Sequence, residues 1–416
     1  MNKVATSVLA MLVAGIAAAA ATAAAAPAPS ILKFAFGNRA AEAGWTQVTA
    51  TNTYSDRAGY GFDPDTELSG TDYLTSEKPF LFSVKLPEGN YAVTALLNDQ
   101  SGEAITTVKA EQRRLMLEKI RLHPGTLAPR TFIVNVRTPR ISGTERVHLK
   151  PRELQTETID WDDRLTLEFN GQHPTLRALV IQPTNVPTVF IAGDSTVCDQ
   201  PAEPWNSWGQ MLPRFFQPDV AVANYAESGE TIRSSLGAHR FDKIFSLMKP
   251  GDYLFMQFGH NDMKDKATNA LAVYKSNLEK LVDRTRKFGG TPVLVTSMER
   301  KAGVDHDTLA GYPKTGRDVA AEKHCPLIDL NAMSRKFYRA LGENLGVAFQ
   351  DGTHHNNYGS YELAKCVVEG IQEAKLPLAS SIVSDFSGFD PAKPDSFQTF
   401  KMPASPMISH EKPLGN

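Results

Sequence analysis

The spacing of the apolar residues changes near Pro187, and this change constrains the fold more than any other feature of the chain. Before this point, short alternating or β-branched runs are separated by turn residues, which is typical of antiparallel strands. After it, apolar runs of strand length alternate with segments whose apolar residues recur at helical spacing. We therefore expect an all-β region followed by an α/β region.

Residues 31–185 are predicted to form a β-sandwich of the jelly-roll kind. Residues 87–90 are predicted to join the first two strands as a hairpin, and Asn170-Gly171 is predicted to form another turn. The predicted strands cover residues 80–86, 91–97, 131–136, 165–169 and 176–181.

Residues 186–383 are predicted to form a three-layer α/β/α domain with a parallel sheet, because strand and helix patterns alternate there. The tail, residues 384–416, is rich in Pro, Ser and Asp and is expected to wrap the surface or stay loose. The strands of this domain are expected at residues 189–192, 220–225, 253–258, 292–296 and 326–330. Its helices are expected at residues 208–215, 241–248, 271–281 and 363–371.

Residues 1–26 have the pattern of a secretory signal peptide, because Lys3 precedes an alanine-rich apolar run that ends in small residues. No second apolar stretch reaches the roughly 20 residues that cross a bilayer. We therefore expect a secreted or periplasmic protein that has no membrane contact once the signal peptide is removed.

The composition is that of an ordinary globular protein. Of the 416 residues, 42% are hydrophobic and 22% are charged, and the formal net charge is −2. This balance has no basic excess, so nucleic acid is not an expected partner. Three cysteines, Cys198, Cys325 and Cys366, allow at most one internal disulfide, and their spacing matches neither a zinc site nor a thioredoxin-like motif.

Residues with reactive or polar side chains collect after the predicted parallel strands. Ligands of open α/β sheets bind outside the carboxyl ends of the strands, so these residues are expected to share one site. Three blocks follow the first three strands, and a fourth precedes the last helix. They read Gly193-Asp194-Ser195-Thr196, Glu227-Ser228-Gly229-Glu230, Gly259-His260-Asn261-Asp262 and Asp351-Gly352-Thr353-His354.

Three of these residues can form a nucleophilic triad. Ser195 stands where a strand turns toward a helical segment, which would expose its hydroxyl at the sheet edge. His354 is suited to take the hydroxyl proton near neutral pH. Asp351, three residues earlier, can accept a hydrogen bond from the other ring nitrogen and hold the imidazole tautomer.

The four blocks, in this order, resemble the signature blocks of the SGNH (GDSL-like) hydrolase superfamily. The flanking segments Lys249-Pro-Gly-Asp-Tyr253 and Gln257-Phe-Gly-His-Asn-Asp262 resemble rhamnogalacturonan acetylesterases. The β-rich region is similar to the galactose-binding-like domain that precedes many of their relatives. The resemblance implies an oxyanion hole made by the backbone N–H groups of Ser195 and Gly229 and the side-chain amide of Asn261. It also implies an exported serine esterase that removes acetyl groups from a pectic polysaccharide.

Other residues are candidates for contacts with this acetylated polysaccharide. Arg233 could pair with a galacturonate carboxylate, Trp205 could stack on a sugar ring, and His260 belongs to the third block. The histidines and aspartates of the blocks match no zinc spacing, so neither a metal nor another cofactor is expected.

Two further hypotheses stay open at this point. The first keeps the mechanism but changes the substrate to acetylated xylan, another short-chain ester or a lipid. The second is a non-catalytic carbohydrate-binding protein. Because all of Ser195, Asn261, Asp351 and His354 are present, the sequence favours an enzyme over this binding protein.

Overall fold

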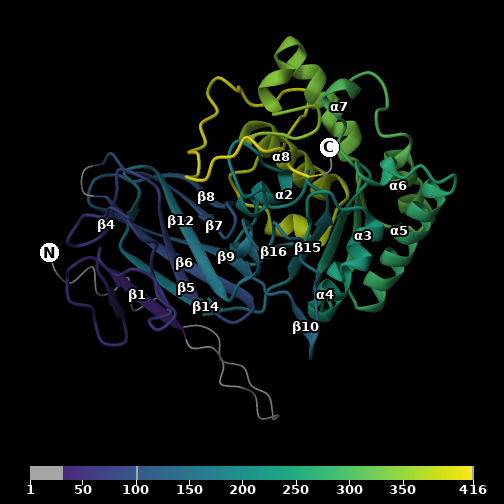
Figure 1. The fold of residues 1–416 in the computed structure, drawn as a ribbon. Helices are drawn as coiled ribbons and strands as arrows, with labels where there is room; N and C mark the ends of the chain where they lie inside the picture. The colour runs from purple at the N-terminus through teal and green to yellow at the C-terminus, as the bar shows by residue number, and fades with distance from the viewer. Residues whose placement is uncertain (1–30, 100–101, 415–416) are drawn as a thin grey trace. The chain divides into compact units, whose positions relative to one another are not determined.

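The computed structural model describes residues 31–99 and 102–414, in which two mainly antiparallel five-stranded sheets precede a parallel five-stranded sheet (Figure 1). The predicted signal peptide, residues 1–26, lies outside the described residues. Within the described ranges, no helix combines the length and the apolar character needed to cross a bilayer.

The two N-terminal sheets share one aromatic core. Phe34 and Phe36 of the first sheet contact Phe82 of the second edge-on, with ring centroids 5.5 and 4.9 Å apart. Two sheets that bury their apolar faces against each other form a β-sandwich. The first sheet has the order β2 (Thr46–Val48), β1 (Leu32–Phe36), β14 (Ala178–Pro183), β6 (Gly89–Asp99) and β9 (Thr126–Val136). The second has the order β3 (Tyr60–Phe62), β5 (Phe80–Lys85), β12 (Arg164–Gln172), β7 (Ile105–Ala110) and β8 (Arg114–Arg121).

Two predicted turns of this region are wrong. The segment between β5 and β6 crosses from one sheet to the other, so it does not form a hairpin. Turn residues indicate that the chain changes direction, but not which strands then pair. Asn170 and Gly171 lie inside β12. Gly171 has a φ of +119°, and a Cβ there would lie 2.2 Å from the carbonyl oxygen of Ile105 on β7, so the glycine permits a close approach of two strands.

The predicted parallel sheet is confirmed. Its strands are buried on both faces, which explains their continuous apolar character in the sequence. The last strand is shorter than expected, because the Asp329 side chain accepts a hydrogen bond from the Ala332 N–H and caps the following helix. The order is β16 (Ala221–Asn224), β15 (Thr188–Gly193), β17 (Tyr253–Gln257), β18 (Thr291–Val295) and β19 (Leu327–Ile328).

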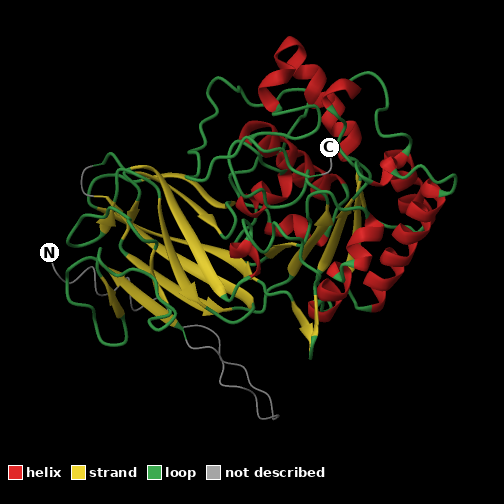
Figure 2. Ribbon diagram, viewed as in Figure 1, coloured by secondary structure: helices red, strands yellow, loops and turns green. Residues whose placement is uncertain are grey.

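Helices cover both faces of the parallel sheet (Figure 2). Val189 and Ile191 of β15 pack on one face with α2, α7 and α8, whereas Phe190 packs on the other face with α4, α5 and α6. The predicted helix at 208–215 is split into an α-helical and a 3-10 turn that contains Pro213. The helices are α2 (Trp208–Met211), α3 (Ile232–Gly237), α4 (Arg240–Leu247), α5 (Ala270–Lys287), α6 (Tyr312–Glu322), α7 (Leu330–Leu341) and α8 (Asn357–Glu373).

The described part of the tail packs on α8. Phe397 contacts Tyr358, and Phe400 contacts Tyr361, with ring centroids 6.3 and 5.5 Å apart. Farther along, the carbonyl of Ala404 accepts a hydrogen bond from Asn170 of β12 at 2.9 Å. The tail therefore connects the last helix to the N-terminal sandwich.

Phe82→Ala is expected to destabilise the protein by about 3–5 kcal/mol, because it removes a fully buried ring and leaves a cavity between the two sheets. Phe288→Ala is the matched control, since Phe288 is 38% exposed. Urea unfolding of both variants measures the two losses. Equal losses would contradict the shared aromatic core.

Candidate active site

The four sequence blocks come together because of the strand order. Ser195 follows β15, and its neighbours in the sheet, β16 and β17, lead to Gly229 and Asn261. Parallel strands end at the same sheet edge, so these three loops emerge side by side. Asp351 and His354 lie in the loop before α8.

Ser195, His354 and Asp351 form one continuous hydrogen-bonded path. The Oγ of Ser195 lies 2.8 Å from Nε2 of His354, and Nδ1 of His354 lies 2.9 Å from Oδ2 of Asp351. Both Ser195 and His354 are buried. If Nδ1–H donates to the carboxylate, Nε2 carries the lone pair that accepts the hydroxyl proton of Ser195. The spacing predicted from the sequence therefore places a serine, an imidazole and a carboxylate in line.

The carboxylate of Asp351 is held in its ionised form. Its Oδ1 accepts hydrogen bonds from the backbone N–H groups of Thr353 and His354, each at 2.7 Å. Burial alone would raise the pKa of Asp351, but the hydrogen bonds from the His354 ring and from these two N–H groups hold it well below its usual range. A negative charge therefore faces the imidazole throughout the neutral pH range.

The three predicted oxyanion donors retain free N–H groups. Among the described residues, no protein acceptor takes a hydrogen bond from the backbone N–H of Ser195 or Gly229. The Asn261 amide is oriented by donating to the Glu230 carbonyl at 3.1 Å and by accepting from Lys264 at 2.9 Å. An amide NH₂ carries two hydrogens, so a second N–H of Asn261 stays available.

His260 is buried beneath the loops. Its Nδ1 lies 3.3 Å from the carboxylate of Asp194, and its Nε2 lies 3.0 Å from the carbonyl of Met298. Both ring nitrogens are thus engaged with protein groups. This arrangement favours a structural role for His260 over the substrate contact predicted from the sequence.

His355, the neighbour of His354, packs against aromatic side chains and not against Ser195. Its Nε2 lies 2.9 Å from the hydroxyl of Tyr338, and its ring packs on Phe349 with centroids 4.1 Å apart. Burial, together with the nearby His354 and His260, lowers the pKa of His355 to about 3. His355 is therefore neutral at physiological pH and packs in the core.

Trp205 lies directly against His354. Its ring meets the imidazole edge-on with centroids 5.8 Å apart, and its Nε1 donates to the carbonyl of Ser409 at 3.1 Å. Only 7% of Trp205 is exposed, so little of the ring is available to stack on a sugar. The position favours packing beside the triad over the predicted stacking contact.

Arg233 borders a hollow of about 180 Å³ next to Asn261. Its side chain is 65% exposed, and its guanidinium lies 3.5 Å from Asp265. Asp262 lines the same hollow, where its Oδ2 has no hydrogen-bond partner among the described residues. Burial raises the pKa of Asp262 to about 7. The hollow therefore combines one exposed cation with hydrogen-bonding groups beside a predicted oxyanion donor.

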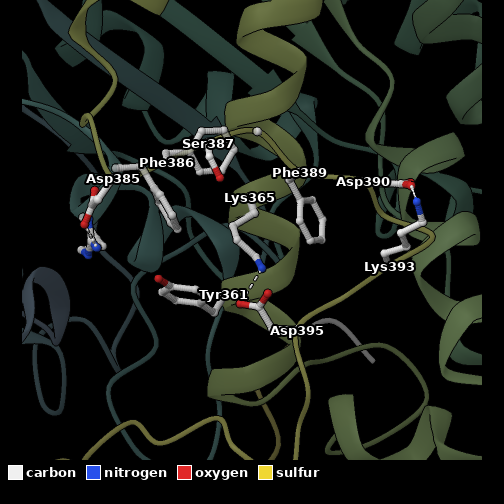
Figure 3. A pocket seen from close by; sticks show the side chains of 12 residues that line it. Tyr361, Lys365, Asp385, Phe386, Ser387, Phe389, Asp390, Lys393 and Asp395 are labelled. Carbon is white, nitrogen blue, oxygen red and sulfur yellow. Dashed lines mark hydrogen bonds and ion pairs between the residues drawn. The ribbon is translucent and has the colours of Figure 1, made fainter.

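A larger hollow, of about 360 Å³, includes none of the predicted site residues (Figure 3). It lies between α8 and the tail, where Lys365 points toward Asp395 and pairs with it at 2.8 Å. Lys365 also pairs with Glu362 at 2.8 Å and lies over the ring of Phe389 at 4.2 Å. The charge of Lys365 is therefore already compensated by two carboxylates.

Three buried carboxylates lie behind the second block. Those of Glu153, Glu157 and Glu227 have oxygens within 4.8 Å of one another, a spacing that could hold a metal ion. Arg152 pairs with Glu227 and Glu157, and Arg240 pairs with Glu153 at 2.5 Å. Each of the three carboxylates is thus already paired with a guanidinium group, so the donor set gives no argument for a metal.

Two residues that support the loops escaped the sequence analysis. Gln200 donates from Nε2 to the carbonyl of Ser195 at 2.6 Å. Lys150, from the segment before the α/β region, donates to the carbonyl of Ser228 at 2.6 Å and pairs with Glu230 at 2.6 Å. Neither lies in a recognisable motif, because each is defined only by the loop that it contacts.

All three cysteines are buried free thiols. Burial raises the pKa of Cys198, three residues after Ser195, well above its ordinary value. Its Sγ lies 3.2 Å from the Ser228 hydroxyl. This thiol therefore packs between the first two loops and is not activated as a nucleophile.

Comparison with known proteins identifies the family to which the chain is similar. The GDSL-like lipase/acylhydrolase family matches residues 191–360. The rhamnogalacturonan acetylesterase RhgT of Bacillus subtilis (strain 168) is 37% identical over 219 residues, which cover 47% of this chain and 94% of RhgT.

A longer similarity joins the chain to the uncharacterized esterase YxiM of Bacillus subtilis (strain 168). The two are 26% identical over 372 residues, which cover 83% of this chain and 91% of YxiM. The crystal structure of YxiM covers 84% of this chain and 99% of its own, with 26% identity and a TM-score of 0.46. The sequence alignment with YxiM covers 83% of this chain and therefore includes part of the β-rich region.

Glu157→Gln is expected to reduce the decrease in the free energy of unfolding that accompanies a rise to alkaline pH. Burial and the negative charge of Glu227 raise the pKa of Glu157 from 4.5 to about 9. The folded state therefore binds more protons than the unfolded state between these values, so the free energy of unfolding falls as pH rises through this window. Each unit of pKa difference corresponds to about 1.4 kcal/mol.

Urea unfolding at about pH 6 and about pH 9 checks this prediction. The parent protein should lose more stability between the two conditions than the Glu157→Gln variant. Glu343→Gln, which removes an exposed carboxylate, is the control and should follow the parent. The same pH dependence in all three proteins would show that Glu157 is not protonated in the folded state.

Proposed function

The chain belongs to the GDSL-like lipase/acylhydrolase family and is a carboxylic ester hydrolase; on this premise we propose that it removes acetyl groups from a pectic polysaccharide of the rhamnogalacturonan type. The path from Ser195 through His354 to Asp351 carries the proposal. In it, Ser195 is the nucleophile, His354 the general base and Asp351 the group that orients the imidazole.

The reaction begins when Ser195 Oγ attacks the acetyl carbonyl carbon. His354 Nε2 accepts the hydroxyl proton, and the ionised Asp351 stabilises the imidazolium through Nδ1–H. The imidazolium then donates this proton to the sugar oxygen as the ester bond breaks. Water repeats the same steps on the acetyl-serine, which releases acetate and restores Ser195.

The developing negative charge on the carbonyl oxygen needs donors that are already in place. The backbone N–H groups of Ser195 and Gly229 and the second N–H of Asn261 are proposed to supply them. Gly229 has a φ of +77°, a backbone conformation that glycine adopts without strain. Lys264 and the Glu230 carbonyl fix the Asn261 amide before substrate arrives, which avoids reorganisation in the transition state.

Two observations support a small acyl group on a pectic chain. Trp205 fills the space beside His354, which leaves less room there for a long acyl chain. RhgT, which shares 37% of its aligned residues with this chain, is named as a rhamnogalacturonan acetylesterase. Arg233, exposed beside the hollow at Asn261, is proposed to pair with a galacturonate carboxylate of the polymer.

Export is part of the proposal, because a cell meets such a polymer outside its cytoplasm. It rests on the sequence pattern of residues 1–26, and the protein would act as a secreted or periplasmic enzyme. The division into a sandwich at 31–185, a hydrolase domain at 186–383 and a tail at 384–416 is proposed on the same terms. A galactose-binding-like role of the sandwich stays a prediction.

The substrate is tested by measuring acetate release from acetylated rhamnogalacturonan, acetylated xylan and a long-chain ester. Release from the pectic polymer alone, lost in Ser195→Ala, is the expected result. A preference for xylan or for the long-chain ester would keep the mechanism and replace the substrate. No release that depends on Ser195 from any of the three would overturn the proposed function.

Asn261→Ala is expected to fold normally and to lose about 10²–10³-fold in turnover, the usual effect of removing one oxyanion donor. Turnover of a small acetyl ester and thermal unfolding measure activity and folding separately. Asn269→Ala, at an exposed asparagine before α5, is the control. Near-parental turnover of Asn261→Ala would remove Asn261 from the oxyanion hole.

Arg233→Gln is expected to raise KM for acetylated rhamnogalacturonan a few-fold, since an exposed ion pair contributes about 0.2–1 kcal/mol. KM for a small neutral acetyl ester should stay unchanged. Arg339→Gln is a suitable control, because Arg339 is similarly exposed and also pairs with an aspartate. An equal change for both substrates would argue against a carboxylate contact.

A further inference from the structure

We infer that the tip of the β7–β8 hairpin, residues 111–114, supports the loop after the nucleophile, and that Arg113 is a positioning residue for the reaction at Ser195. The inference rests on the proposed function, because it concerns the same reacting centre. On this inference, the N-terminal sandwich contributes to the active site by positioning the loop after Ser195.

The tip is buried, although hairpin turns normally lie at the surface. Glu111, Gln112, Arg113 and Arg114 are between 1% and 6% exposed. Glu111 and Arg113 have φ values of +52° and +64°, which residues other than glycine rarely adopt. Such a conformation persists where the surroundings enforce it. Around Glu111 these surroundings belong to the sandwich, where the carbonyl of Thr166 accepts from its backbone N–H, whereas around Arg113 they belong to the α/β region.

Arg113 connects both ends of the segment that follows the nucleophile block. Its Nη1 donates to the carbonyl of Gln200 at 3.1 Å and to that of Trp205 at 3.0 Å, and its Nη2 pairs with Glu203 at 2.6 Å. Three contacts to residues 200–205 from one planar guanidinium fix the shape of this segment.

Each end of the segment touches one member of the triad. Gln200 donates to the carbonyl of Ser195 at 2.6 Å, and the Trp205 ring packs on His354 with centroids 5.8 Å apart. Arg113 is therefore one residue removed from the nucleophile and one residue removed from the base. A shift of the segment would change the distance between Ser195 and His354, on which the proton transfer depends.

The rest of the tip strengthens the same contact. Arg114, 1% exposed, pairs with Asp199 at 2.6 Å and with Asp160 at 2.7 Å. Gln112 donates to the carbonyl of Asp199 at 3.0 Å and accepts from Gln210 of α2 at 2.6 Å. The tip thus contacts both the carboxylate and the backbone carbonyl of Asp199.

Glu203 brings the loop before α8 into the same network. Besides Arg113, its carboxylate accepts hydrogen bonds from the Asn357 amide at 3.1 Å and from the Ser405 N–H at 3.1 Å. Asn357 opens α8, three residues after His354. One guanidinium therefore ties the nucleophile loop, the base loop and the tail together.

Arg113 is expected to differ from a buried cation that only stabilises the fold. Lys243 of α4 offers the matched case, because it is equally buried and pairs with Glu88 of the N-terminal region at 2.6 Å. Neither Lys243 nor Glu88 contacts the segment 195–206 through a hydrogen bond or an ion pair among the described residues. Loss of the Lys243–Glu88 ion pair should lower stability without affecting the reaction at Ser195.

The test compares kcat and KM for a small acetyl ester in the parent, Ser195→Ala, Arg113→Gln, Arg113→Lys and Lys243→Gln, with thermal unfolding of each. Arg113→Gln should lower kcat about tenfold or more with little change in KM, since a displacement of about 1 Å can reduce a rate about 100-fold. Arg113→Lys restores one charge and should recover part of kcat. Lys243→Gln should unfold earlier and keep the parental kcat.

Two results would overturn the inference. The first is a folded Arg113→Gln variant with parental kcat, and the second is a loss of kcat in Lys243→Gln as large as in Arg113→Gln. If Arg113→Gln does not fold, the comparison rests on Arg113→Lys. A parent protein without turnover that depends on Ser195 would instead refute the proposed function, and with it this inference.

Discussion

The common edge at which β15, β16 and β17 end is the constraint on which the site depends. A rigid sheet buried on both faces places the starts of three loops a few ångströms apart, whatever the loops contain. Ser195, Gly229 and Asn261 occupy these starts. The sheet thus positions Ser195, the proposed nucleophile, and the predicted oxyanion donors, and the loop before α8 carries His354 and Asp351, the proposed base and its carboxylate partner.

Much of this arrangement could be predicted from the sequence. Strands buried on both faces leave continuous apolar runs, so the five parallel strands were recognisable close to their observed positions. The blocks around Ser195, Asn261 and His354 were recognisable because each combines reactive side chains with a strand or helix boundary. The limits of the elements were less predictable. The end of β19 is determined by the Asp329 cap, a feature that an apolar pattern does not report.

The remaining features depend on contacts between distant residues. The sequence cannot show that β5 and β6 belong to different sheets. Turn residues such as those between them are equally suited to a hairpin and to a crossing from one sheet to the other. His260 is engaged by the Met298 carbonyl, which lies 38 residues away in the sequence. The contacts of Arg113 with the segment after Ser195 depend on the pairing of β7 with β8, which places Arg113 at the turn between them. A local motif carries none of this information.

The network around Glu203 also bears on how the protein folds. The hydrogen bonds between Arg113 and Trp205, Glu203 and Ser405, and Asn170 and Ala404 join residues that are 92, 202 and 234 positions apart. Contacts of such long sequence separation form slowly, because a large chain entropy is lost before they stabilise the structure. The surroundings of Ser195 are therefore complete only when the sandwich, the parallel sheet and the tail are all in place. A chain that has already acquired most of its secondary structure would still lack an ordered reaction centre.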